Sequence, residues 1–167
     1  MDGKNHILIF SFLTICLTGC PAPQPHSTQD KTLAPNQAYR HFEQWLVPTA
    51  GTISSSFNDG ENHNKGINIS GIKGQPIVAV ADGQVLYVGN ALKGYENLII
   101  IKHNNIFRSA YSNNQQALVK EQEFVKAGQV IATMGSSNNA APQLHFEIRK
   151  NGVPVDPMAY LPSQSTR

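Results

Sequence analysis

Eight residues near the end of the chain, 142–149, alternate strictly between apolar and polar side chains. The apolar positions are Leu144, Phe146 and Ile148, and the polar positions are Gln143, His145, Glu147 and Arg149. Strict alternation over this length predicts a β-strand with one buried face. The polar face then presents Gln143 and His145 one pleat repeat, or roughly 7 Å, apart. Two histidines at these positions would make a metal-binding edge, but this chain has only one of them.

Residues 1–19 differ in character from the rest of the chain. An apolar run from Ile7 to Leu17 follows Lys4, and this run is too short to span a bilayer comfortably as a permanent helix. Such a run is typical of a secretory signal peptide. It ends in Leu17-Thr18-Gly19-Cys20, which resembles the lipobox of bacterial lipoproteins. We expect removal of residues 1–19 and lipidation of Cys20; the alternatives are an uncleaved anchor helix or a plain secretory signal with a chance cysteine.

A polar, proline-rich segment, residues 21–37, follows the predicted lipidation site and contains almost nothing to bury. We expect residues 20–40 to form the lipidated cysteine and a flexible tether, 41–162 a folded domain, and 163–167 a C-terminal tail. Both cysteines of the chain, Cys16 and Cys20, precede this domain, so its stability cannot depend on a disulfide. Pro21 stands where an aspartate would favour retention in the inner membrane, so we expect a lipid anchor in the outer membrane, facing the periplasm.

Short apolar runs separated by turn residues fill the predicted domain, and no long amphipathic helical pattern appears. This arrangement predicts an all-β domain of packed antiparallel sheets. The run 99–101 consists of three isoleucines and suits a central strand buried on both sides. Asp82-Gly83 predicts a hairpin between strands at 75–80 and 84–89, and Asn151-Gly152 predicts a second hairpin. With 13 Lys and Arg, 11 Asp and Glu and no long basic run, the composition argues against nucleic acid as a partner.

Several short motifs follow one another through the domain. They are Pro48-Thr-Ala-Gly51, Lys65-Gly-Ile67, Gly74-Gln-Pro-Ile-Val-Ala79, Asp82-Gly-Gln-Val85, Ile99-Ile-Ile-Lys-His103, Ala127-Gly-Gln-Val130, Leu144-His-Phe-Glu-Ile-Arg149 and Asp156-Pro157. Over about residues 45–162 this series resembles a LytM-type, lysostaphin-like peptidase domain, which implies two antiparallel sheets of the duplicated hybrid motif type. Within that family, Lys93-Gly94-Tyr95 and residues 97–103 most resemble the lipoproteins that activate cell-wall amidases. Those lipoproteins usually hold a LysM glycan-binding module as well, and we find none in this sequence.

An active LytM-type peptidase carries His-x-Gly-x-Asp, then Tyr-x-His, then His-x-His. The resemblance implies that the first histidine, the aspartate and the last histidine bind zinc, and that the other two histidines act on water and the oxyanion. The corresponding residues of this chain are Asn64, Asn68, Asn113, Gln143 and His145. Only the last of these is retained, and neutral carboxamides are poor zinc donors beside imidazole and carboxylate. Carboxamides cannot exchange protons at neutral pH either, so we predict no metal, no cofactor and no hydrolysis.

Two further histidines of the domain, His63 and His103, lie outside these family positions. His63 is one residue away from the first ligand position, and a shift by one residue turns a side chain to the opposite side of an extended segment. His103 ends the isoleucine strand, where we expect a hydrogen-bonded structural role.

The resemblance implies a non-catalytic activator of a periplasmic N-acetylmuramoyl-L-alanine amidase, acting in septal peptidoglycan splitting and cell separation. A regulatory segment of the amidase would bind a groove, and Tyr and Arg are favoured anchors at such interfaces. The residues we expect in or beside this groove are Lys65, Tyr95, Arg108, Tyr111, Gln143, His145 and Arg149. Peptidoglycan is a second candidate partner. The alternatives are a peptidoglycan-binding scaffold lipoprotein and an active zinc metalloendopeptidase of the cell wall.

Overall fold

The computed structural model describes residues 45–59, 63–136 and 140–162. These residues form eleven strands and one short 3-10 helix. The elements are β1 (Thr52–Ser55), β2 (Ile67–Ser70), β3 (Pro76–Val78), β4 (Gly83–Gly89), β5 (Leu98–Lys102), β6 (Phe107–Ser112), β7 (Asn114–Ala117), β8 (Phe124–Val125), β9 (Val130–Met134), β10 (Gln143–Lys150), β11 (Val153–Val155) and the 3-10 helix Pro157–Ala159. The described residues contain no helical segment with the length and apolar character of a membrane span. The predicted signal peptide, Cys20 and the predicted tether lie outside the described residues.

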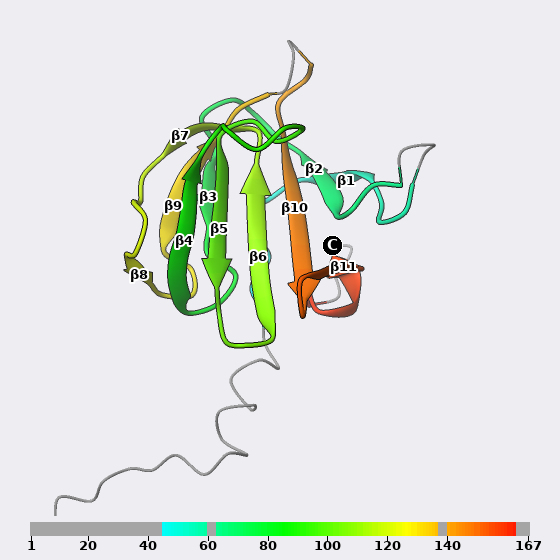
Figure 1. The fold of residues 1–167 in the computed structure, drawn as a ribbon. Helices are drawn as coiled ribbons and strands as arrows, with labels where there is room; N and C mark the ends of the chain where they lie inside the picture. Colours follow the sequence, from blue (N-terminus) through cyan, green and yellow to red (C-terminus); the bar gives the residue numbers. More distant parts are fainter. Residues whose placement is uncertain (1–44, 60–62, 137–139, 163–167) are drawn as a thin grey trace, which may run out of the picture. The chain divides into compact units, whose positions relative to one another are not determined.

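The larger of two sheets contains eight antiparallel strands. Its strands follow the order β1-β2-β10-β6-β5-β4-β8, and β11 pairs with β10 beside this path. The strand that was predicted from strict alternation, β10, therefore lies between β2 and β6 in the interior of the sheet (Figure 1). Segments that are far apart in the sequence meet along β10. The face of β10 that is turned away from the core can therefore combine residues from several segments in one site.

The smaller sheet contains three antiparallel strands in the order β3-β9-β7. A single hydrophobic core includes residues of both sheets, among them Ile77, Ile131 and Met134 from the smaller sheet and Ile99, Ile101 and Phe146 from the larger one. Each such side chain stabilises the fold by about 1.5–3 kcal/mol when it is fully buried. The predicted all-β fold of two packed antiparallel sheets is confirmed.

The two faces of β10 differ as the alternation predicts. Leu144, Phe146 and Ile148 are fully buried in the core. The isoleucine strand β5 follows the same rule, because Ile99 and Ile101 are buried while Ile100 lies on the opposite face and is partly exposed. The prediction of a β5 buried on both sides therefore holds only in part. The face of the sheet that is turned away from the core is called the outer face below.

The predicted hairpin at Asp82-Gly83 is wrong. The strand before it, β3, pairs with β9 in the smaller sheet, whereas β4 pairs with β5 and β8 in the larger sheet. The connecting residues 79–81 are buried and pass from one sheet to the other. The Asp82 carboxylate accepts hydrogen bonds from Lys126 Nζ and from the backbone N–H of Ala127, each at 2.8 Å. Two apolar runs on either side of Asp-Gly match the hairpin pattern. This pattern does not tell whether the two strands pair with each other or join different sheets that pack across the core.

The predicted hairpin at Asn151-Gly152 is confirmed. Lys150 of β10 is paired with Val153 of β11, so these two residues alone form the turn. Their φ angles are 52° and 83°, the left-handed values that two-residue hairpin turns require. Glycine and asparagine adopt such values at the lowest cost, which explains why this sequence turns here.

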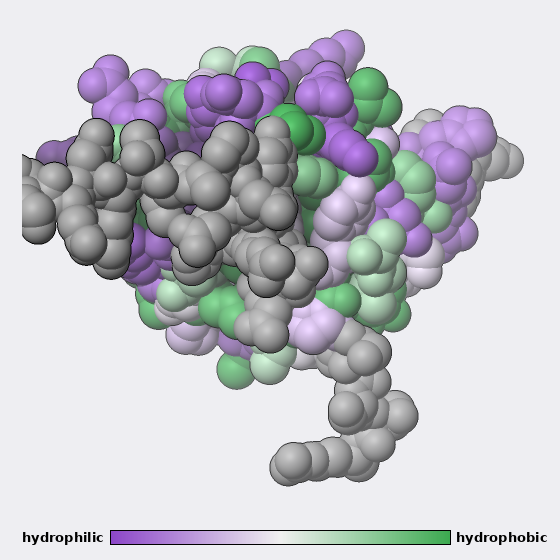
Figure 2. Space-filling model, turned by 90° about the horizontal axis from the view of Figure 1, so that it is seen from below, coloured by the Kyte–Doolittle hydropathy of each residue, from purple (hydrophilic) through white to green (hydrophobic). Residues whose placement is uncertain are grey.

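Apolar residues are dispersed over the one face of the molecule that Figure 2 shows. Among the residues drawn in colour in Figure 2, hydrophobic and hydrophilic residues are interspersed over the face that is turned to the viewer. Isolated exposed apolar side chains are normal on soluble domains and need no partner.

Candidate functional site

A row of polar residues crosses four neighbouring strands on the outer face. Ser55 of β1 is paired with Asn68 of β2, Asn68 with His145 of β10, and His145 with Ser112 of β6. Residues directly opposite one another in an antiparallel pair have Cβ atoms about 5 Å apart. The register of β2 with β10 therefore places Asn68 and His145 side by side, although 77 positions of sequence separate them.

His145 uses both of its ring nitrogens within the protein. Its Nδ1 lies 2.8 Å from Asn68 Oδ1, and its Nε2 lies 3.1 Å from Glu147 Oε1. A carboxylate only accepts hydrogen bonds, so Nε2 donates its proton to Glu147. The ring also lies against Tyr95, with the ring centroids 6.1 Å apart. His145 is held as part of a hydrogen-bonded surface, and neither nitrogen is left over for another ligand.

The other residues at the predicted ligand and base positions adjoin the same row. Gln143 lies two positions before His145 on the same face, and its Oε1 accepts a hydrogen bond from Ser54 Oγ at 3.2 Å. The side-chain amide of Asn64 donates to Ser55 Oγ at 3.1 Å. Asn113 follows directly after the last residue of β6 and adopts a left-handed φ of 65°.

The residues present do not fit a catalytic zinc ion. Zinc in proteins takes cysteine, histidine and carboxylate donors, and a catalytic site needs about three of them. This neighbourhood offers three asparagines, one glutamine, one imidazole whose nitrogens are both engaged, and the carboxylate of Glu147, which is bonded to that imidazole. In the part of the chain that the structure describes, no three His, Cys, Asp or Glu side chains come together as a metal ion would require. His63, which precedes the first ligand position, is exposed and has a left-handed φ of 47°.

A buried glutamate, Glu147, lies at the centre of the outer face, and sequence reasoning did not single it out. Its side chain is 0% exposed. Tyr95 Oη donates to its Oε1 at 2.6 Å, and Arg149 Nε donates to its Oε2 at 2.7 Å. The Arg149 guanidinium donates a further bond to Tyr95 Oη at 3.2 Å. Alternation placed Glu147 on the polar face, but its burial depends on the loop that brings Tyr95 over the sheet.

These contacts shift the pKa values of the three partners. Burial alone would raise the pKa of Glu147, but the hydrogen bonds from His145, Tyr95 and Arg149 outweigh burial and hold that pKa below its ordinary value of 4.5. Burial and the hydrogen bond to Glu147 raise the pKa of Tyr95 to about 12. Burial opposes the charge of Arg149, but its bonds to Glu147 raise the pKa of the guanidinium. The carboxylate is therefore charged at neutral pH, and its charge is already matched.

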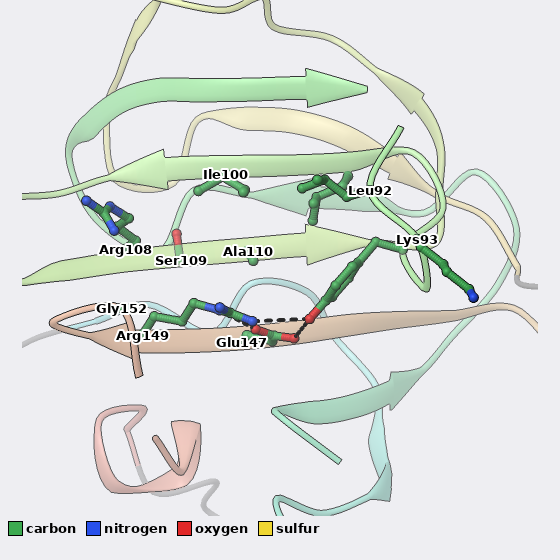
Figure 3. A pocket seen from close by; sticks show the side chains of 11 residues that line it. Leu92, Lys93, Ile100, Arg108, Ser109, Ala110, Glu147, Arg149 and Gly152 are labelled. Atoms are coloured by element: carbon green, nitrogen blue, oxygen red, sulfur yellow. Dashed lines mark hydrogen bonds and ion pairs between the residues drawn. The ribbon is translucent and has the colours of Figure 1, made fainter. Parts of the chain in front are cut away.

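A pocket of about 310 Å³ opens on the outer face beside this cluster (Figure 3). It is lined by Leu92, Lys93, Tyr95, Leu98, Ile100, Arg108, Ser109, Ala110, Glu147, Arg149 and Gly152. Three of the residues predicted for the partner groove, Tyr95, Arg108 and Arg149, are among them. Gln143 and His145 adjoin the pocket along β10 without lining it, and Lys65 is exposed before β2. The structure thus brings part of the predicted groove together around one hollow.

The prediction that Tyr111 lines the groove is wrong. Tyr111 is 0% exposed, packs against Phe146 and lies on the core face of β6. Its Oη accepts a hydrogen bond from Val80 N at 3.0 Å and lies 3.0 Å from Ser109 Oγ. Ser109 in turn lies 2.7 Å from Nε2 of His103. Because successive residues of a strand point to opposite faces, Arg108 reaches the outer surface and Tyr111 cannot.

His103 belongs to this internal chain of hydrogen bonds. Its Nδ1 lies 2.8 Å from the backbone oxygen of Asp82, and its ring packs edge-on against Trp45. Burial lowers the pKa of His103, an effect that the neighbouring Asp82 carbonyl offsets only in part. The histidine connects β5, β6 and the start of β4, which agrees with the structural role predicted for it.

Residues 62–157 match Peptidase family M23. The chain is 52% identical over 141 residues to the "Murein hydrolase activator NlpD" of Salmonella dublin, covering 84% of this chain and 36% of that protein. It is 55% identical over 118 residues to the "Outer membrane antigenic lipoprotein B" of Haemophilus influenzae, covering 71% of this chain and 29% of that protein. The chain thus spans about a third of the length of these curated relatives.

A solved structure agrees with these sequence matches. The antimicrobial peptidase lysostaphin from Staphylococcus simulans superimposes with a TM-score of 0.63 at 26% identity, covering 72% of this chain and 53% of that one. The resemblance predicted from the ordered motifs is thereby confirmed, for the LytM type and for the likeness to NlpD. This chain belongs to Peptidase family M23, with the two-sheet fold of a LytM-type, lysostaphin-like domain.

Proposed function

We propose that this chain is a non-catalytic lipoprotein that activates a periplasmic N-acetylmuramoyl-L-alanine amidase through the outer face of its LytM-type domain. The observation that carries the proposal is the pairing of His145 with Asn68 and Glu147. In an active relative of this family the corresponding histidine and aspartate would hold zinc. Here an amide replaces the aspartate, and the histidine is bonded within the sheet.

The donor set supports the loss of hydrolysis. Water becomes a strong nucleophile at neutral pH only when a metal lowers its pKa or a base removes its proton. Asn113 and Gln143, at the positions where the family has histidine bases, are neutral amides that can do neither. Amides of similar size keep the cleft polar and able to form hydrogen bonds. The surface can therefore still bind a partner although it no longer supports hydrolysis.

The relatives' names support the activator role. The relative from Salmonella dublin is named a murein hydrolase activator, and the one from Haemophilus influenzae is named an outer membrane lipoprotein. We infer the same location for this chain, anchored through Cys20 in the outer membrane and facing the periplasm. We further infer a role in septal peptidoglycan splitting and cell separation, where amidases of this kind act.

Activation requires a difference in affinity between two states of the amidase. A domain that binds only the open state, in which an inhibitory helix has left the active site, shifts the population towards that state. Moving an equilibrium from 1:99 to 99:1 takes about 5.5 kcal/mol of differential binding. A surface with several charged and aromatic anchors supplies an amount of this order.

The test is stimulation of peptidoglycan release. The full chain, purified in detergent, is mixed with each N-acetylmuramoyl-L-alanine amidase of the same cell on dye-labelled sacculi. We expect dye release far above that of the amidase alone, and none from the chain alone. Failure to stimulate any of these amidases would refute the activator role. Cleavage of wall peptides by the chain alone would instead establish a peptidase.

A further inference from the structure

The pocket on the outer face has an apolar floor. Leu98 and Ala110 are buried there, and Ile100 is partly exposed between them. Leu92, on the loop before β5, is 45% exposed and lines the same hollow. Apolar residues at the bottom of an open hollow gain free energy when another apolar side chain covers them. The floor therefore suits an aliphatic or aromatic side chain of a partner.

A row of three cationic residues crosses the sheet at one end of this pocket. The register pairs Lys102 of β5 with Arg108 of β6, and Arg108 with Arg149 of β10. Like charges placed directly opposite one another destabilise a sheet. A row of this kind therefore needs another favourable interaction that offsets the repulsion. Arg149 is matched by Glu147, whereas the described part of the chain offers Arg108 and Lys102 no ion pair. Both positive charges remain available to an anion.

The pocket has an excess of positive charge. Its lining contains Lys93, Arg108 and Arg149 against one carboxylate, Glu147, which is already engaged. Figure 3 shows Arg108 and Lys93 at opposite ends of the pocket, with Glu147 between them. The whole chain carries a net charge of only +2, so this small hollow holds an excess as large as that of the entire sequence. Charge complementarity points to an acidic occupant.

The cluster of Glu147, Tyr95 and Arg149 fixes one wall of the pocket. Each of the three is bonded to the other two, and Glu147 is fully buried. Side chains that are already held in place lose little conformational entropy when a partner binds. Arg108 is exposed and adjoins this wall, because the register of β6 and β10 pairs it with Arg149.

We infer that the pocket receives an acidic, amphipathic segment of the murein hydrolase, with one apolar side chain against Leu98, Ile100 and Ala110 and a carboxylate against Arg108. The inference rests on the proposed activator function and specifies the chemistry of the segment that is recognised. Peptidoglycan also carries carboxylates, but its glycans and short peptides offer little apolar surface for the floor. A protein segment provides both features at once.

The test measures binding of the full chain in detergent to the amidase that it stimulates, at low and high salt. Arg108→Glu reverses the charge that faces the carboxylate, so we expect about tenfold weaker binding and a flatter salt dependence. Arg108→Lys keeps the charge and should bind nearly as the native chain does. Lys120→Glu makes the same charge change at an exposed residue outside the pocket and should leave binding unchanged.

A second variant tests the apolar floor. Ile100→Thr keeps the β-branched shape and adds a hydroxyl at a partly exposed position, so we expect binding to weaken several-fold while thermal unfolding changes little. Native-like binding by both Arg108→Glu and Ile100→Thr would overturn the inference and leave the activator function standing. If the native chain stimulates no amidase, the proposed function fails instead. If Arg108→Glu loses binding to isolated sacculi but not to the amidase, the pocket recognises the wall and the inference is wrong.

Discussion

At the scale of single residues, Glu147 holds its polar neighbours on the outer face in place. A buried carboxylate is costly unless it is paired and hydrogen-bonded, and Glu147 meets both conditions through Arg149, Tyr95 and His145. The strand pattern indicated a polar face at this position but not a buried one. The residue therefore positions the side chains around it, and it is unavailable to a partner.

The first prediction concerns the substitution Glu147→Gln. Because folding lowers the pKa of Glu147, the unfolded chain takes up a proton at higher pH than the folded chain. The stabilisation is therefore full at neutral pH and is lost as the pH falls below 4.5 through the lowered folded value. We expect the unfolding free energy of the variant at pH 7 to be about 2 kcal/mol lower than that of the native chain. This figure is kept small because solvent screens the charge of the partly exposed Arg149.

Urea unfolding at pH 7 and at pH 3 measures this effect. The difference between the native chain and Glu147→Gln should shrink on acidification. Arg108→Gln, which removes an exposed cation of the same sheet, serves as the control and should change stability little at either pH. A difference that stays constant from pH 7 to pH 3 would show that the charge of Glu147 does not stabilise the fold.

At the scale of strands, the site depends on the close approach of β2 and β10. Their pairing places Asn68 opposite His145, and Gly66 lies just before β2 at the point of closest approach. A Cβ atom on Gly66 would lie 2.0 Å from the backbone oxygen of Phe146, which cannot move without breaking the sheet. The small residue at this position is needed for packing.

We therefore predict that Gly66→Ala lowers the unfolding free energy by about 4 kcal/mol or more, an exceptional loss for one methyl group. Gly152→Ala is the matched control. Its Cβ would meet nothing within 4 Å, so only the left-handed φ of 83° opposes it, at a cost of about 1 kcal/mol. Urea denaturation of the two variants measures the difference. Equal losses would mean that β2 and β10 lie further apart near Gly66 than the structure describes.

At the scale of the whole molecule, the chain has the two-sheet fold of a LytM-type domain, and we propose that this fold serves recognition in place of hydrolysis. If the five family positions account for the loss of zinc, then restoring them should restore metal binding. We expect the variant Asn64→His, Asn68→Asp, Asn113→His, Gln143→His to retain zinc near one equivalent after dialysis. Metal analysis should find none in the native chain, and adding His145→Ala to the variant should abolish the gain. Stoichiometric zinc in the native chain would contradict the proposal.

The proposed location depends on Cys20, which lies outside the described residues. Each methylene of an acyl chain contributes about 0.8 kcal/mol to membrane association, so removing the acyl chains should release the protein. We predict that Cys20→Ser moves the chain from the outer membrane fraction to the unprocessed or soluble fractions, and mass spectrometry should show no acyl groups. If the variant remains in the outer membrane at the native level, another feature anchors the protein.

Local patterns in the sequence were sufficient for several features. Strict alternation over 143–149 determined which side chains of β10 enter the core, because a pleated strand turns successive residues to opposite faces. Asn151-Gly152 determined a two-residue turn through its tolerance of left-handed φ. The ordered motifs identified the family, whereas the amide-rich cleft at its ligand positions stays a prediction.

Only the tertiary structure decided which residues are neighbours in space. β3 and β4 join different sheets, Tyr111 lies in the core, and Glu147 is buried beneath Tyr95. Each of these outcomes depends on a contact between residues far apart in the chain, which a local pattern does not specify. For the same reason, the basic row of Lys102, Arg108 and Arg149 becomes visible only when three strands are placed in register. The sequence by itself determined the family and the faces of the strands, and long-range packing decided which of those side chains a partner can reach.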